Sequence, residues 1–272
     1  MSIAIHDPAL RLLRGCLLLV AMLAGGAGSA RALEPGEFDP APFDSLLRAY
    51  VRDGAVDYAS WKRDGLVPLD RFLDAAAEYD LGSILGKEPR AAFLINAYNA
   101  WAIRQVVAAY PVERLQDIPG FFDANLRRIA GEERSLARIE ADLAAMLPHQ
   151  PDFVFSLSPG ARDLPAPPGE ACRSDDFLRR LRRAGSAYLK GAYPPVYDRG
   201  RNTLVLPPAF RGHLERFQAL PKGLAGFLAD YLPLVDLVAL NDGTHAIEIA
   251  VSEGLLRRPA PASPADSSEA GR

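Results

Sequence analysis

The segment from Arg90 to Ala109 places the strongest limit on what this chain can fold into. Pro89 precedes it, and proline is favoured in the first turn of a helix. A helix that is apolar on several sides has to be buried. We therefore expect a central buried helix with the rest of the fold around it. Its apolar residues are Phe93, Leu94, Ile95, Trp101, Ile103, Val106 and Val107.

Other helices are predicted before and after this one. Ser135 can cap a helix that runs to about Met146, and Ser174 can cap another. Short helices are expected near Ala209–Phe217 and Gly223–Leu232. Two amphipathic helices are predicted earlier in the chain, from Phe43, Leu46, Leu47, Tyr50 and Val51 and from Leu69, Phe72, Leu73 and Ala76.

Strands are predicted to be short and joined by tight turns. Residues 153–155 form an apolar run typical of a buried strand, and residues 158–173 form a loop rich in proline and glycine. Turn residues predict two hairpins, over 197–206 and over 235–251. This order of elements predicts the α+β class, as a mainly helical single domain with a small antiparallel sheet and hairpins.

The N-terminus has the features of a secretory signal peptide. Arg11 and Arg14 precede an apolar run over 17–24, and small residues lead to a cleavage site after Ala32. The alternative is a membrane anchor, but this run is shorter than the roughly 20 residues that span a bilayer. We expect a periplasmic or secreted product. The predicted parts are a signal peptide (1–32), a linker (33–42), a folded domain (43–256) and a disordered tail (257–272).

Composition and charge exclude several function classes. The net charge of −3 makes the chain a poor candidate for binding nucleic acid. No later segment is apolar enough to span a membrane. Loss of Cys16 with the signal would leave Cys172 without a disulfide partner. The scattered histidines have no metal-binding spacing, and nucleotide-binding loops are absent, so we predict no metal and no cofactor.

Two asparagines, Asn96 and Asn99, lie inside the predicted central helix and share one face. A buried amide has to be hydrogen-bonded. One interpretation is that the pair ties this helix to neighbouring loops, and it is the one that the physics of buried amides favours. The other is that the pair orients a catalytic group or a ligand.

The ordered motifs of the chain resemble those of the domain-of-unknown-function 547 family. The most specific is the helix Phe93-Leu94-Ile95-Asn96-Ala97-Tyr98-Asn99. The resemblance spans about residues 43–232. Its other motifs are Phe43-Asp44-Ser45-Leu46-Leu47, Tyr50 to Gly54, Val56-Asp57-Tyr58, Ser135-Leu136, Ile139-Glu140, Val205-Leu206 with Phe210, and Phe217.

The chain departs from this family where the family's reactive groups would stand. Members typically carry a histidine after Ile-Glu, and Ala141 stands there in this chain. Members also carry two cysteines in a later loop, where this chain has Pro159 and Leu164. Such cysteines with such a histidine would suggest a thiolate nucleophile with an imidazole base. The resemblance therefore implies a scaffold that has lost a thiol-type site.

Three functional hypotheses follow. In the first, the chain is a non-catalytic binding or accessory module. Enzyme activity is then uncertain, and thiol catalysis is disfavoured. The second is a cell-envelope hydrolase or transferase that uses residues around a cleft, with Asn96, Tyr98, Asn99, Glu140, Asp57 and Tyr58 as candidates. The third gives these residues a role in folding alone.

Two further features leave alternatives open. Cys172 with His213 would be a relocated dyad, and the simpler interpretation is a loop cysteine and a surface histidine. The arginines after Ser174 are either a solvated helix face or a patch for an anionic cell-envelope component. They are Arg179, Arg180, Arg182 and Arg183.

Overall fold

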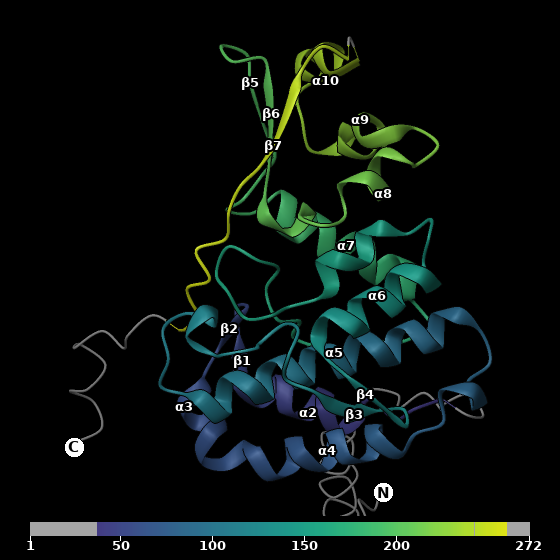
Figure 1. The fold of residues 1–272 in the computed structure, drawn as a ribbon, viewed down its shortest axis with the longest axis vertical. Helices are drawn as coiled ribbons and strands as arrows, with labels where there is room; N and C mark the ends of the chain where they lie inside the picture. The colour runs from purple at the N-terminus through teal and green to yellow at the C-terminus, as the bar shows by residue number, and fades with distance from the viewer. Residues whose placement is uncertain (1–36, 242, 260–272) are drawn as a thin grey trace, which may run out of the picture. The chain divides into compact units, whose positions relative to one another are not determined.

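The computed structural model describes residues 37–241 and 243–259, and the expected signal peptide lies outside them. The described chain is a mainly helical α+β domain (Figure 1). Its α-helices are α2 (Ala41–Tyr50), α3 (Tyr58–Ser60), α4 (Leu66–Glu78), α5 (Lys87–Ala109), α6 (Leu136–Met146), α7 (Phe177–Leu189), α8 (Leu214–Gln218), α9 (Gly223–Phe227) and α10 (Leu234–Asn241). None of these helices combines the length and hydrophobicity that crossing a bilayer requires.

The central helix is α5, as the sequence predicts. Gly86 precedes it with a positive φ of 90°, and Pro89 lies in its first turn. It ends at Ala109, because Tyr110 adopts the extended backbone that a following proline favours. It packs against α4 and α6 (Figure 1), and most of its residues are buried. The prediction of a buried central helix is therefore confirmed.

Short single-turn helices complete the helical part. The run over 153–155, predicted as a strand, is helical and belongs to η4 (Pro151–Ser156). Short apolar runs do not distinguish a strand from a helix, and here Phe155 packs among Tyr188, Phe210, Phe217 and Phe227. The short helices of the described chain are η1 (Trp61–Gly65), η2 (Leu81–Ser83), η3 (Leu115–Asp117), η4 (Pro151–Ser156), η5 (Pro208–Phe210) and η6 (Leu228–Asp230).

The strands form three small sheets in the described residues. Two are antiparallel pairs, β1 (Val51–Arg52) with β2 (Ala55–Val56) and β3 (Arg127–Ile129) with β4 (Glu132–Arg134). The third has the order β5 (Val196–Asp198), β6 (Thr203–Leu206), β7 (Ala246–Ile249).

This third sheet differs from the predicted one. The hairpin of β5 and β6 is confirmed, but β6 pairs with β7 in parallel, so the sheet is mixed rather than antiparallel. The predicted hairpin over 235–251 is wrong, since α10 occupies its first half. The apolar run of α10 suits a helix as well as a strand, and β7 pairs with β6 rather than with this run.

The last described residues lie across several earlier segments. The backbone N–H of Arg257 donates to the carbonyl of Gly160 at 2.8 Å, and the carbonyl of Arg257 accepts from the N–H of Val56 at 3.3 Å. The backbone N–H of Leu256 donates to the carbonyl of Glu113 at 2.9 Å. Arg257, the first residue of the expected disordered tail, is thus hydrogen-bonded to the folded domain.

Candidate functional site

Asn96 and Asn99 bind backbone groups of two loops with their whole amides. Asn96 Nδ2 donates to the carbonyl of Cys172 at 2.8 Å, and its Oδ1 accepts from the N–H of Cys172 at 2.7 Å. Asn99 Nδ2 donates to the carbonyl of Ser156 at 3.0 Å, and its Oδ1 accepts from the N–H of Ser158 at 2.8 Å. We call these five residues the asparagine clamp. Its bonds are those of the first interpretation, which ties the helix to its loops.

Tyr98 and Glu140 lie in a separate cluster with His213. Glu140 Oε1 and His213 Nε2 are 2.6 Å apart. The ring of His213 also packs edge-on against Phe153, with centroids 5.7 Å apart. Burial raises the pKa of Tyr98 well above its usual range, and the charge of Glu140 adds to the shift. His213 is buried, so the expectation of a surface histidine is wrong.

Asp57 and Tyr58 have structural surroundings. Asp57 caps α3, and its Oδ1 accepts from the N–H of Ser60 at 3.0 Å. This hydrogen bond lowers the pKa of Asp57. Tyr58 is buried, its hydroxyl has no hydrogen-bond partner in the described chain, and burial raises its pKa. A Cβ atom at Gly160 would lie 2.6 Å from this hydroxyl, so the loop backbone passes directly over Tyr58.

The three positions where the family's reactive groups would stand have different surroundings. Ala141 is exposed on α6, Pro159 is buried, and Leu164 is half-buried and packed against the core. The carbonyl of Leu164 accepts from Arg257 Nη2 at 3.3 Å. None of the three side chains carries an ionisable group.

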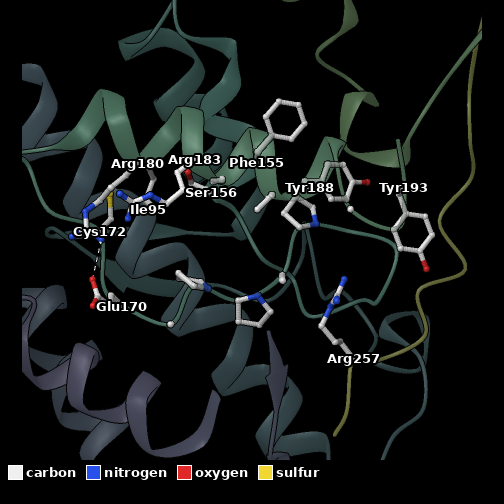
Figure 2. A pocket seen from close by; sticks show the side chains of 18 of the residues that line it. Ile95, Phe155, Ser156, Glu170, Cys172, Arg180, Arg183, Tyr188, Tyr193 and Arg257 are labelled. Carbon is white, nitrogen blue, oxygen red and sulfur yellow. Dashed lines mark ion pairs between the residues drawn. The ribbon is translucent and has the colours of Figure 1, made fainter. Parts of the chain in front are cut away.

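A cavity of the described residues lies between α7 and the loop over 165–172 (Figure 2). We call it the groove. Its volume is about 500 Å³. Most of its lining is apolar. The lining residues are Ile95, Phe155, Ser156, Pro165, Ala166, Pro167, Pro168, Gly169, Glu170, Cys172, Arg180, Arg183, Ala184, Ala187, Tyr188, Gly191, Ala192, Tyr193 and Arg257.

Cys172 belongs to both regions, since the clamp holds its backbone and its thiol lines the groove. Burial raises the pKa of this thiol to about 12, so it is protonated at neutral pH. No histidine lines the groove, and His213 binds Glu140 instead. The structure therefore does not form the Cys172–His213 dyad.

The arginines of α7 do not form one free patch. Arg179 and Arg180 both pair with Asp176, and Arg180 also lies 3.6 Å from Glu170. Arg182 interacts electrostatically with Asp152. Arg183 lines the groove, and no carboxylate of the described residues is within ion-pair distance of it. Only part of the predicted cluster is thus available to an anion.

The sequence did not predict the groove. Two clamp residues, Ser156 and Cys172, line it. The proline-rich loop and the face of α7 near Ala187 and Tyr188 supply further lining residues. Arg257 completes it from the far end of the chain. The proline-rich composition of 158–173 was the available signal, but it does not say what the loop encloses.

Among the described residues, no three His, Cys, Asp or Glu side chains are arranged to hold a metal ion. Comparisons of the chain with protein-family models, with curated proteins and with solved structures give no match. The resemblance to the domain-of-unknown-function 547 family therefore stays a prediction from the motifs.

Proposed function

We propose that this chain is an exported, non-catalytic binding module and that the groove is its ligand site. In this proposal the scaffold resembles the domain-of-unknown-function 547 family and has lost that family's thiol-type site. One observation carries the proposal: the groove has a volume of about 500 Å³ and a mostly apolar lining that also includes Arg183 and Arg257. This volume lies within the range of about 300–1,000 Å³ that is usual for small-molecule sites.

The polar groups near the groove favour binding over catalysis. A nucleophile needs a base or a lowered pKa, and the pKa of the Cys172 thiol is raised. The amides of Asn96 and Asn99 are used by loop backbone. Glu170, the carboxylate of the lining, lies beside Arg180. These contacts leave no activated nucleophile or general base facing the groove from the described residues.

A neutral, environment-sensitive dye such as Nile red tests whether the groove takes a ligand. We expect its fluorescence to rise and shift to the blue with the wild-type protein. Ala187→Trp places a large ring in the groove from an exposed position and should weaken dye binding at least fivefold. Leu178→Trp is the matched control, because Leu178 is exposed nine residues earlier, on the opposite side of α7.

The comparison of the two tryptophan variants also distinguishes the groove from a competing dye site. Helix α10 exposes Leu234, Val235 and Val238, which could bind a hydrophobic dye by themselves. If Ala187→Trp binds the dye as the wild type does, or if Leu178→Trp loses as much binding as Ala187→Trp, the groove is not the ligand site.

A second test asks whether the thiol takes part. Cys172→Ser should keep dye binding within about twofold, because a protonated thiol contributes contact area and no charge. Alkylation is less informative here, since a bulky adduct on Cys172 would fill the groove. A measured turnover that is lost in Cys172→Ser would contradict a non-catalytic role. A turnover lost in Glu140→Gln with dye binding intact would favour the alternative, a cell-envelope enzyme.

A further inference from the structure

The two ends of the groove differ in charge (Figure 2). At one end Arg180 faces Glu170 and Asp176, so its charge is already compensated. At the other end lie Arg257 and Tyr193. No carboxylate of the described residues lies within ion-pair distance of Arg257. An anion entering the groove therefore meets, at the Arg257 end, a cation that has no ion-pair partner among the described residues.

Backbone carbonyls fix the guanidinium of Arg257 but leave part of it unused. Its Nη2 donates to the carbonyl of Arg162 and, at 3.3 Å, to the carbonyl of Leu164. Its Nε is buried and has no hydrogen-bond partner in the described chain. A buried donor without an acceptor is unfavourable, so an acceptor that reached this atom would stabilise it. A guanidinium that is already held in place loses little freedom on binding a carboxylate or phosphate.

The two tyrosines of this part of the lining differ in whether their hydroxyls are hydrogen-bonded. The Tyr188 hydroxyl donates to the carbonyl of Asp163 at 2.8 Å and is thus occupied. Tyr193 lines the groove, and no hydrogen bond of its hydroxyl is formed with the described residues. Tyr193 and Arg257 lie at the same end of the groove (Figure 2), and both act electrostatically on the Tyr188 hydroxyl, as does the carboxylate of Asp163. The Tyr193 hydroxyl is therefore a second donor at the Arg257 end of the groove.

The rest of the groove suits an apolar body. Ile95, Phe155, Pro165 and Ala187 line it, and apolar surface removed from water contributes about 25 cal/mol per Å². A small inorganic anion would leave this surface in water, whereas an uncharged hydrocarbon would leave Arg257 without an acceptor. The ligand that satisfies both features has an oxyanion head group and one apolar chain.

We propose that the groove binds a single-chain amphiphile with an oxyanion head, held by Arg257 and Tyr193, with its chain lying toward Cys172. This inference rests on the proposed function, because it names the ligand class of the same site. Carboxylate and phosphate heads share the chemistry, and the experiment separates them.

Calorimetric titration with four decyl compounds below their aggregation concentrations tests the head group. They are decanoate, decyl phosphate, decanol and decyltrimethylammonium. We expect at least one of the two anions to bind at least tenfold more tightly than decanol, and the ammonium compound to bind more weakly than decanol. The ratio of decanoate to decyl phosphate then identifies the preferred oxyanion.

Variants locate the preference. Arg257→Gln should lower the affinity for the preferred anion about tenfold and leave decanol within twofold. Arg183→Gln removes the same charge from another part of the lining and should lower it less than threefold. Tyr193→Phe should weaken anion binding about threefold. Circular dichroism checks the folding of each variant. If Arg257→Gln does not fold, the anion-to-decanol affinity ratios of the wild type and the loss in Tyr193→Phe decide whether the head-group assignment holds.

The outcomes separate this inference from the proposed function. Equal binding of decanol and both anions, or an equal loss in Arg183→Gln and Arg257→Gln, overturns the assignment of the head group. In that case groove binding, measured with the dye and Ala187→Trp, still stands. If neither the dye nor decanol binding responds to Ala187→Trp, both proposals fail.

Discussion

The asparagine clamp and the Arg257 end of the groove are both built from buried or half-buried polar groups, yet the two asparagines and the arginine differ in how their side chains are bonded. Each clamp asparagine both donates to and accepts from loop backbone. The Nε atom of Arg257 is buried and has no partner in the described chain. A polar residue whose bonds are complete is explained by folding, whereas an incomplete one beside a cavity indicates a ligand. The comparison moves the candidate site from the asparagines to the groove beside them.

Cys172 gives the sharpest test, because its backbone belongs to the clamp and its thiol to the groove. With a pKa of about 12 in place of about 9, the thiolate fraction at pH 8 falls roughly a thousandfold. We expect iodoacetamide to modify the native protein about a thousandfold more slowly than the urea-unfolded protein. Mass spectrometry of timed samples measures both rates. A native rate within tenfold of the unfolded one would contradict the raised pKa, and a native rate above the unfolded one would mean that the thiol is activated and that the groove has reactive chemistry.

Removal of one clamp amide should be costly for folding. Asn96→Ala leaves both the N–H and the carbonyl of Cys172 without partners in the interior, and we expect a loss of about 3 kcal/mol in unfolding free energy. Urea denaturation followed by circular dichroism measures it. Arg183→Gln is the matched control from the groove and should change stability by less than about 0.5 kcal/mol. Similar losses in the two variants would remove the distinction between the regions.

The sequence alone predicted those features of the clamp region that depend on local pattern. Pro89 and the apolar residues predicted α5, and Ser135 predicted α6, whose N-cap it forms by accepting from the N–H of Arg138 at 3.2 Å. The rule that buried amides must be bonded predicted the clamp in outline, without naming Cys172 or Ser156 as its partners.

The groove was beyond the sequence because distant residues form it. Arg257 falls in a segment whose composition is typical of a disordered tail, and it is fixed by bonds to Arg162 and Leu164, more than 90 positions earlier. The interaction of Glu140 with His213 joins residues that are 73 positions apart. Residues 153–155 turned out helical because tertiary packing, and not their β propensity, decides the state of so short a run.

The buried ionisable groups predict how stability depends on pH. Burial raises the folded-state pKa values of Cys172 and Tyr98 above their unfolded values. The stabilisation from such groups is complete below the unfolded pKa, which is 9.0 for the thiol, and is lost as the pH rises toward the folded value of about 12. We expect the thiol alone to cost about 1 kcal/mol of unfolding free energy between pH 8 and pH 10.

Urea denaturation at pH 8, 9 and 10 measures this dependence. Cys172→Ala is the matched variant, since it removes the thiol and keeps the tyrosines, which have an unfolded pKa of 10.0 and respond mainly at higher pH. Its stability should fall less steeply than that of the wild type over this window. Equal slopes would mean that the thiol is exposed to water, and the groove would then be a more open and polar site than its lining suggests.

Tyr58 supplies the smallest and most discriminating case, because its hydroxyl is unpartnered, as Arg257 Nε is, but faces the packed backbone at Gly160. Since the Gly160 backbone lies directly beside this hydroxyl, we expect the missing bond only to cost stability. Tyr58→Phe removes the unsatisfied hydroxyl and should raise the unfolding free energy by about 0.5 kcal/mol without changing dye or decanoate binding. Urea denaturation and the calorimetric titration measure the two quantities. A clear loss of stability would show that the hydroxyl has a partner, and a loss of binding would extend the ligand site to Tyr58.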